Sequence, residues 1–416
     1  MLKNLKTVIV VLLASVLLFN MFACSKDAED CVDTSSNSEP SVNAPTPAPD
    51  TDSESDGGEN KGDIQITTTY LNANTSGIKL LGVRGISSET QINCDHSGSG
   101  IEFTLRNTGR SLAFEVTSSA ACRFKVFIDG EVCKSVSGEN FFEVNGTGII
   151  TIGSVPLGNH TVSLVKITDG AYATAQLTRV IYSGIISEDT PQNKKTYIEF
   201  IGGSDAVGTG LVAGNGYSSQ DVTEAYTYKL AKMMDTDYSV FSVASPVTGE
   251  QELSALYTKA SFIRDADNEY DFSRKADVAI IDLGALDESL ADVDCEVFAG
   301  KYKDLINTVR AKNGDTCKIV CIYRSSFDKI ATAIQTVCQD ALGGQENGYY
   351  LCKMADGEDG TLNAAEIADF LPVLQNTVDS AIKGVITEKG MEAEENGGSL
   401  VVDFNTFLPV KNKQTT

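Results

Sequence analysis

The sequence predicts two folded domains: an all-β sandwich, then a three-layer α/β domain with a mostly parallel sheet. Two observations predict this order. From residue 64 to about 187, short runs alternate apolar and polar residues without a helical period. From residue 195 to about 384, apolar strands alternate with amphipathic helices, as in a parallel sheet covered on both faces. The 416-residue chain has room for both domains and for terminal extensions.

The first 24 residues have the composition of a secretory signal. Lys3 and Lys6 precede an apolar run over residues 8–19, shorter than the roughly 20 residues that span a membrane. Cys24 follows the small residue Ala23, as at a bacterial lipobox. We therefore expect Cys24 to carry a lipid and the chain to be an exported lipoprotein at the outer membrane or cell surface. An ordinary signal peptide with an unrelated cysteine is the alternative.

An acidic linker is predicted between the signal and the first domain. Residues 25–63 contain 11 acidic residues, two lysines and almost nothing apolar. Such a segment buries too little surface to offset the entropy of ordering, so we expect it to be disordered. The formal net charge of the chain, −24, argues against nucleic acid and anionic membrane surfaces as partners. Membrane contact is expected only through the lipid. Residues 385–416 are assigned to a C-terminal extension.

Residues 64–187 form the predicted sandwich, for which a jelly roll fits best and an immunoglobulin-like topology is the alternative. Its hairpin signal is Asp129-Gly130, a two-residue turn that places Cys133 opposite Val126 and leaves Cys122 out of register. A disulfide needs Cα atoms within about 7 Å, so we expect these two cysteines to be unbonded. No CxxC pair occurs, and neither a metal nor a cofactor is predicted. The apolar runs are centred on residues 101–105, 112–116, 124–128, 149–152, 162–167 and 177–182.

The α/β pattern begins with a strand that runs directly into Gly202-Gly203-Ser204. In parallel sheets, ligands bind beyond the carboxyl ends of the strands. Ser204 and Asp287 each follow a strand, so we expect them on the same rim. The expected strands are 197–201, 238–243, 276–283, 317–323 and 349–354, and the expected helices are 222–234, 296–312, 327–342 and 364–382.

Three segments together resemble carbohydrate esterase family 2, whose catalytic half is an SGNH (GDSL) hydrolase. They are SGSGIEFTL (97–105), GNHTVSLVKIT (158–168) and YIEFIGGS (197–204), and the resemblance covers about residues 77–382. It implies a jelly roll before an SGNH-type domain with a flavodoxin-like three-layer parallel sheet, and an activity that removes acetyl groups from polysaccharide. It also implies that Ser204 is the nucleophile position and that Ser245 and Gly284 are oxyanion positions. The family's late Asp-x-His, which supplies the base, corresponds to Asp359-Gly360-Thr361.

The chain departs from the family pattern at four places. Gly203 replaces an aspartate before the serine, and Ala-Ser-Pro-Val at 244–247 replaces Ser-Gly-x-Gly. Leu286 replaces the asparagine of Gly-x-Asn-Asp, which removes an amide donor. Thr361 replaces the catalytic histidine, and Leu362 replaces the proline that follows it.

The lost histidine matters because a serine hydroxyl is a poor nucleophile until a base takes its proton. An aspartate on the rim, with an ordinary pKa of roughly 4, is too weak a base. Of the two histidines in the chain, His96 is expected in a turn and His160 at a sandwich edge. We therefore expect Ser204 to be inactive and the protein to bind polysaccharide as a pseudoenzyme. An active esterase with another base and a non-enzymatic envelope interaction protein are the alternatives, and the glycan and the oligomeric state stay open.

Two further motifs have structural interpretations. Residues 355–366 match the second half of an EF-hand loop, but Ala355 and Gly357 occupy two ligand positions. A capping box formed by Asn363 and Glu366 at the last helix is the better interpretation. The glycines at 208, 210 and 214 lack the lysine of a phosphate-binding loop and predict a flexible loop on the rim.

Overall fold

The computed structural model describes residues 65–84, 88–261, 263–354 and 362–386. The predicted signal, the lipid site Cys24, the acidic linker and nearly all of the C-terminal extension lie outside these residues. Asp359 and Thr361, the two positions assigned to the degenerate base region, also lie outside them. Among the helices of the described residues, none is long and apolar enough to cross a membrane.

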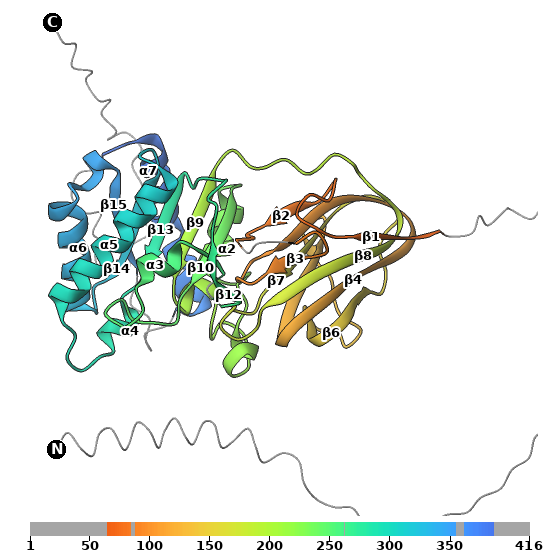
Figure 1. The fold of residues 1–416 in the computed structure, drawn as a ribbon, viewed down its shortest axis with the longest axis horizontal. Helices are drawn as coiled ribbons and strands as arrows, with labels where there is room; N and C mark the ends of the chain where they lie inside the picture. The colour runs from red at the N-terminus through yellow and green to blue at the C-terminus, as the bar shows by residue number, and fades with distance from the viewer. Residues whose placement is uncertain (1–64, 85–87, 262, 355–361, 387–416) are drawn as a thin grey trace, which may run out of the picture. The chain divides into compact units, whose positions relative to one another are not determined.

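The N-terminal domain is built from eight strands whose pairings are all antiparallel (Figure 1). It is therefore an all-β domain, as the alternating pattern predicted, and its jelly-roll topology stays a prediction. The strands are β1 (Ile66–Tyr70), β2 (Lys79–Leu81), β3 (Ile92–Cys94), β4 (Gly100–Ile128), β5 (Glu131–Val132), β6 (Phe142–Ile152), β7 (Gly158–Lys166) and β8 (Ala175–Ile186).

Strand β4 differs from the expected pattern because it joins three predicted runs into one strand of 29 residues. Its pairing with β8 shifts register between Asn107 and Leu112, where Arg110 has a φ of 63°. Its pairing with β6 shifts again between Ser118 and Cys122. Such bulges bend a strand without ending its ladder. The turn-like residues between the runs therefore mark bends in β4.

The hairpin at Asp129-Gly130 is confirmed. Both residues have positive φ, 52° and 86°, as a two-residue hairpin turn requires. The Cys133 N–H donates to the Val126 carbonyl at 2.8 Å, which is the predicted register. Cys122 is buried, Cys133 is half-buried, and both are free thiols.

The C-terminal domain contains a five-stranded parallel sheet with the order β10-β9-β13-β14-β15. This is the flavodoxin-like order that the family resemblance implies, and the alternation of strands and helices predicted its parallel pairing. The strands are β9 (Tyr197–Gly202), β10 (Asp237–Ser242), β13 (Val278–Asp282), β14 (Lys318–Arg324) and β15 (Tyr349–Met354). The sequence did not predict the hairpin of β11 (Lys259–Ser261) and β12 (Asp265–Glu269).

Helices cover both faces of this sheet (Figure 1). Ile198 and Phe200 of β9 belong to a core with residues of α2 and α7, and Ile201 belongs to a second core with residues of α3, α5 and α6. All six residues of β9 are buried, which fits its mostly apolar sequence, YIEFIG. The one charged residue, Glu199, is paired with Arg84. The helices are α2 (Tyr226–Met233), α3 (Leu253–Tyr257), α4 (Ala285–Glu288), α5 (Cys295–Asn313), α6 (Asp328–Thr336) and α7 (Ala364–Lys383).

Both domains lie within one compact unit, residues 62–416. Arg84 of the N-terminal domain is buried against residues of the α/β domain. The Arg84 guanidinium pairs with Glu199 in the middle of β9 and donates to the Tyr257 carbonyl at 2.6 Å. It also lies 4.4 Å from the centre of the Tyr270 ring and 4.9 Å from that of Phe241. Val165 of the sandwich extends the core around α2 and α7 across the interface.

Candidate active site

Ser204 lies where β9 leaves the sheet. Gly202, at the end of β9, is in register with Ser242 of β10 on one side and Asp282 of β13 on the other. The residues that follow these three strand ends therefore lie on one rim, as predicted. This rim includes the β9–β13 boundary, where the strand order reverses and ligands bind in doubly wound folds.

The turn that presents Ser204 depends on close packing. A Cβ at Gly202 would lie 2.8 Å from the Cβ of Ala206, so only glycine lets the chain fold back here. A short 3₁₀ helix, Asp205–Val207, begins directly after Ser204. The Ser204 carbonyl accepts the Thr209 N–H at 3.0 Å, while its side chain is exposed. Among the described residues, no protein group hydrogen-bonds the Ser204 hydroxyl.

The two proposed oxyanion positions are on the rim, but they do not form a pair of free hydrogen-bond donors. The Ser245 hydroxyl is within hydrogen-bond distance of the Gln251 side-chain oxygen, at 3.0 Å. Gly284 precedes α4 with a φ of 114°, and a Cβ there would lie 2.5 Å from Ile330. Leu286, at the asparagine position of the family, is 44% exposed and offers no polar group.

Asp287 ties two rim loops together. It is fully buried, and its carboxylate accepts the N–H groups of Val247 and Thr248, both at 2.8 Å. The Thr248 hydroxyl donates to it as well, at 2.7 Å. The loop after β10 is thereby fixed to the start of α4. With three donors on a buried carboxylate, Asp287 is a positioning residue and is not placed to take a proton from Ser204.

Asp205 is held in a buried ion-pair network directly beneath the Ser204 turn. Its carboxylate pairs with Arg324 at the end of β14 and accepts the Leu362 N–H at 3.1 Å. Arg324 also lies 3.9 Å from Asp282, to which Tyr226 donates a hydrogen bond of 2.9 Å. Burial raises the pKa of Asp282, and the attraction of Arg324 opposes the rise. Asp205 therefore has a structural role, and it anchors the residue that follows Thr361 in the chain.

The sequence reasoning did not identify Arg324 and Asp282. Their signal was a charged residue at the carboxyl end of an otherwise apolar strand, in VAIID and KIVCIYR. The small cavity that these two residues help to line has a volume of about 10 Å³, enough for about one water molecule.

Neither histidine is bonded to Ser204. His96 lies in the turn after β3, as predicted, and is buried with its Nε2 3.4 Å from the Ala260 carbonyl. Burial and the nearby Arg84 charge lower the pKa of His96 to about 4. His160 lies in β7, with its Nδ1 2.7 Å from Asp129 of the hairpin turn. The side-chain hydrogen bond with Asp129 raises the pKa of His160.

The glycine loop after Ser204 is hydrogen-bonded rather than free. The Gly210 N–H donates to the Ser219 carbonyl at 2.9 Å, and Thr209 and Gln220 form a β-bridge. A Cβ at Gly208 would lie 2.2 Å from the Asp221 carbonyl oxygen. These contacts were not predicted from the sequence, because the partners lie about ten residues further along the chain. The flexibility of the loop stays a prediction.

The capping box at α7 is confirmed. The Asn363 side chain accepts the N–H groups of Ala365 and Glu366 at 2.9 and 3.0 Å, and Glu366 accepts the Asn363 N–H at 2.7 Å. Most of the loop that resembles an EF-hand lies outside the described residues. Within the described ranges, no group of three or more His, Cys, Asp or Glu side chains is arranged to hold a metal ion.

Comparison with protein-family models and with curated protein sequences gives no match. Solved structures do match. A family 2 carbohydrate esterase from Clostridium thermocellum, in complex with cellohexaose, is 20% identical and aligns over 74% of this chain and 100% of its own, with a TM-score of 0.66. A family 2 carbohydrate esterase from Cellvibrio japonicus is 15% identical over 77% of this chain and 100% of its own, with a TM-score of 0.66.

A third similar structure is of a carbohydrate esterase whose active site is described as having divergent catalytic and non-catalytic binding functions. It is 17% identical over 76% of this chain and 98% of its own, with a TM-score of 0.55. At these identities the likeness concerns the fold. The chain has the fold of the family 2 carbohydrate esterases.

Proposed function

We propose that the protein is a bacterial cell-envelope lipoprotein that binds polysaccharide at the Ser204 rim and hydrolyses esters poorly or not at all. Cys24 would anchor it to the outer membrane or cell surface, and residues 25–63 would give the folded part reach. The proposal includes a jelly-roll topology for the sandwich. It includes no cofactor.

The observation that carries the proposal is the state of the rim carboxylates. Asp205 is paired with Arg324, and Asp287 accepts three hydrogen bonds. Neither can accept the Ser204 proton without losing these contacts in a buried setting, where an unpaired partner is costly. The family's histidine position holds Thr361, and both histidines of the chain have partners elsewhere. Without a base, only the residual effect of binding and oxyanion donors is expected.

Polysaccharide is the expected ligand because of the structural relatives. The Clostridium thermocellum esterase was solved with cellohexaose, and another relative is described as having non-catalytic binding functions. The chain has no tryptophan, so sugar rings would have to stack on tyrosine or phenylalanine. A partner-binding envelope protein without glycan affinity is the remaining non-enzymatic candidate.

An active esterase is the second candidate. The exposed Ser204 hydroxyl at the end of a buried strand favours it, because this is the placement of a nucleophile. Such an enzyme would need a base that the described residues do not provide to Ser204.

Ester hydrolysis tests the proposal. The purified protein should hydrolyse p-nitrophenyl acetate and acetylated xylan no faster than its Ser204→Ala variant. Thr361→His should introduce weak activity that depends on Ser204, and adding Leu286→Asn should raise it further, since one oxyanion donor is worth about 10² to 10³ in rate. Fast turnover by the wild type that Ser204→Ala abolishes would establish the esterase instead.

Two further measurements address binding and anchoring. Retention of wild type and Ser204→Ala on a glycan array would support the binding function, whereas no retention on any glycan would favour the partner-binding protein. Wild type should incorporate labelled palmitate and sediment with membranes, and Cys24→Ala should do neither.

A further inference from the structure

A second cavity lies between the N-terminal domain and the α/β domain. It is at the amino-terminal ends of the parallel strands, whereas Ser204 follows their carboxyl-terminal ends. Its volume is about 1070 Å³, and its lining includes Tyr197 and Asp237, the first residues of β9 and β10. Six residues of extended strand separate these amino-terminal ends from the rim, a distance of roughly 20 Å. We call this cavity the interdomain groove. It is distinct from the rim that carries the proposed function.

One wall of the groove is a row of polar side chains across three sandwich strands. Lys79 of β2 is paired with Glu102 of β4, and Glu102 is paired with Ser163 of β7. The next pair on the same face of the sheet is Thr104 and Thr161. All five line the groove. Because side chains alternate along a strand, this wall presents hydroxyl and carboxylate groups at every second position.

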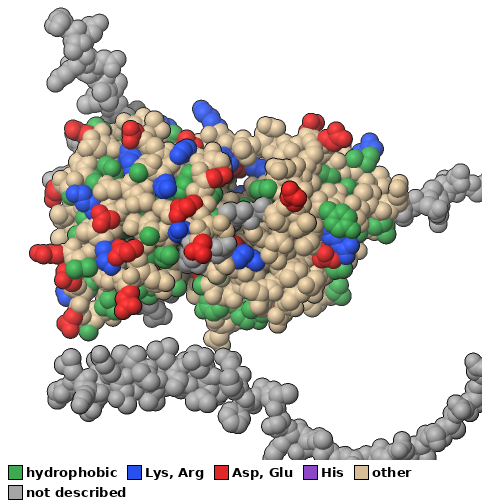
Figure 2. Space-filling model, in the orientation of Figure 1, with side chains coloured by type: hydrophobic (Ala, Val, Ile, Leu, Met, Phe, Trp, Pro, Cys, Tyr) green, Lys and Arg blue, Asp and Glu red, His purple; other side chains and the backbone are tan. Residues whose placement is uncertain are grey.

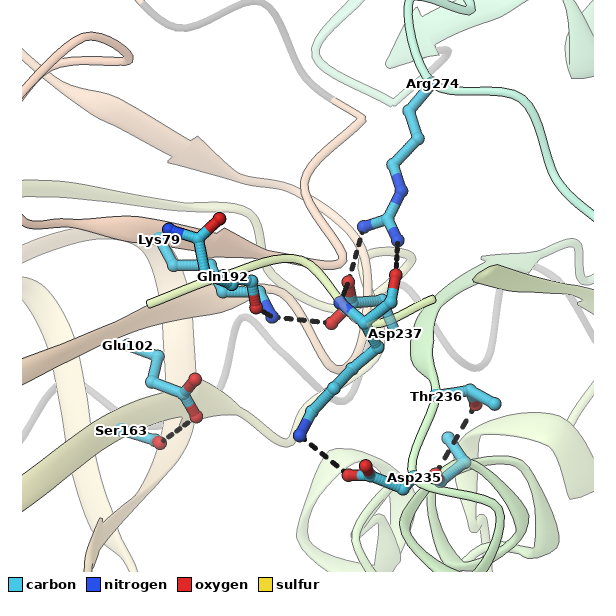
Figure 3. Close-up of polar contacts among 10 residues, drawn as sticks. Lys79, Glu102, Ser163, Gln192, Asp235, Thr236, Asp237 and Arg274 are labelled. Carbon is cyan, nitrogen blue, oxygen red and sulfur yellow. Dashed lines mark hydrogen bonds and ion pairs between the residues drawn. The ribbon is translucent and has the colours of Figure 1, made fainter. Parts of the chain in front are cut away.

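Glu102 is the acceptor of this wall that is most available to a ligand. Its carboxylate accepts the Ser163 hydroxyl at 3.1 Å, and within the described residues it has no cation within ion-pair distance. Figure 3 shows this pair apart from the ion pairs of Asp237 and Asp235. A carboxylate can accept about four hydrogen bonds, so Glu102 has capacity for ligand hydroxyl donors.

Preformed ion pairs join Lys79 of this wall to the α/β side of the groove (Figure 3). The Asp237 carboxylate lies 2.7 Å from the Lys79 ammonium and 2.6 Å from the Arg274 guanidinium, and it accepts the backbone N–H of Lys194 at 2.7 Å. The Lys194 ammonium in turn lies 2.7 Å from Asp235. Lys79 is only 5% exposed, so its ammonium group is held in place by Asp237 and by the Gln192 carbonyl at 3.0 Å. These contacts make a rigid site rather than a loose surface crevice.

The charges of the groove cancel. Its lining contains five basic side chains and five acidic ones, although the whole chain has a formal net charge of −24. Figure 2 likewise shows acidic and basic side chains interspersed on the face toward the viewer, without a continuous patch of one sign. A cavity without net charge gives no overall attraction to anions or to cations. Its paired groups still offer donors and acceptors in fixed directions.

Size and chemistry together point to one class of ligand. The groove exceeds the roughly 300–1,000 Å³ of pockets for single small molecules. Its hydroxyl-rich wall and its equal numbers of acidic and basic side chains suit a ligand with many hydroxyl groups and no charge. Val165, Ala231 and Tyr228 add apolar surface for C–H groups. We propose that the interdomain groove is a binding site for a neutral oligosaccharide, independent of the Ser204 rim.

Hydrogen–deuterium exchange of the full mature chain tests the assignment. The probes are cellohexaose and xylohexaose, each at millimolar concentration, and hexagalacturonate as an anionic control. A neutral probe should protect amides of β2, β7 and the α2–β10 turn, which line the groove, and hexagalacturonate should not. Absence of protection at these amides with both neutral probes, or equal protection by hexagalacturonate, would overturn the proposal.

Two variants locate the binding. Glu102→Ala removes the acceptor without an ion-pair partner and should lower the affinity of the groove for the neutral probe about tenfold. Glu139→Ala, at an exposed glutamate outside the groove, should leave this affinity unchanged. Thr104→Trp should fill the groove and abolish its protection if the melting temperature shows that the variant folds. Protection that persists in Glu102→Ala would contradict the assignment.

The rim provides the separate readout. Protection of residues 202–209 and 243–248 reports the proposed function, and it should be unaffected by Glu102→Ala. If Glu102→Ala loses protection at the groove and keeps it at the rim, the groove binds the probe independently of the rim. Rim protection alone in the wild type would leave the proposed function standing and refute the groove.

Discussion

At the scale of single residues, Arg84 links the two domains by charge as well as by packing. Its side chain is fully buried against Tyr257, Tyr270 and Phe241, and its positive charge is balanced by Glu199 in the centre of the sheet. The carboxylate also accepts the Tyr257 hydroxyl at 2.5 Å. Neither charge has another opposite charge within ion-pair distance among the described residues. Each is therefore stable in the interior only while the other is present.

Arg84→Met should destabilise the protein by about 3–5 kcal/mol, because Glu199 would stay buried without its counter-charge. Adding Glu199→Gln should recover a large part of this loss, since the amide can still accept from Tyr257. Urea unfolding of the wild type and the three variants, including Glu199→Gln alone, measures the coupling. Additive effects of the two substitutions would show that the pair is not energetically coupled.

His96 makes stability depend on pH. Its folded pKa of about 4 lies below the usual 6.5, because burial and the Arg84 charge disfavour the imidazolium, while Asp95 favours it. Between these two values the unfolded chain binds a proton that the folded protein excludes. The free energy of unfolding should thus fall as the pH drops from 6.5 to 4, by on the order of 3 kcal/mol in total.

Urea unfolding at pH 7 and pH 4.5 measures this effect. His96→Gln cannot take up a proton, so it should lose less stability over this interval than the wild type. The other titrating groups contribute equally in both proteins. The same pH dependence in both proteins would assign the acid sensitivity to other groups.

At the scale of elements, helix α7 shows how local sequence determines a boundary. Asn363 and Glu366 form a reciprocal capping box, and Gly384 ends the helix with a φ of 64°. Both signals are local and were readable in the sequence. In contrast, the rim loops are fixed by Asp205 and Asp287, whose partners come from other elements. Their roles could not be read from spacing along the chain.

Asn363→Ala should destabilise the protein by about 1 kcal/mol, because two N–H groups at the start of α7 lose their acceptor. Asn363→Asp keeps the acceptor and adds a favourable negative charge at the helix start, so it should melt close to the wild type. Thermal unfolding of the three proteins checks this. A wild-type melting temperature for Asn363→Ala would show that the cap contributes little.

At the scale of the whole molecule, composition predicts that residues 25–63 contribute no stability. A chain that begins near Gly62 should unfold within about 1 kcal/mol of the full mature protein, because the acidic segment has too few apolar residues to pack. Chemical denaturation of both proteins measures the difference. A larger loss on truncation would mean that the segment binds the folded part.

The sequence was sufficient to predict the strands and helices of the α/β domain. It was insufficient to predict the contacts of that domain with distant segments. Five apolar strands and four helices have clear periodic patterns, and their alternation predicts a parallel sheet covered on both faces. The flavodoxin-like strand order was implied by the family resemblance. Hairpin β11–β12 is too short and polar to predict, and β4 was divided because its bends look like turns. Arg84, Arg324 and the interdomain groove depend on contacts between distant segments. No local pattern marks such contacts.

The pairing of β1 with β8 has a consequence for the order of events during synthesis. The Thr69 and Tyr182 hydroxyls lie 3.0 Å apart although 113 residues separate them in the chain. A chain that emerges N-terminus first, at roughly 5–20 residues per second, leaves β1 without its partner for about 6–23 s. The ITTTY sequence of β1 suits this delay, because its three threonines make the waiting edge polar. The nascent protein can thus wait for its last sandwich strand with little risk of pairing with another chain.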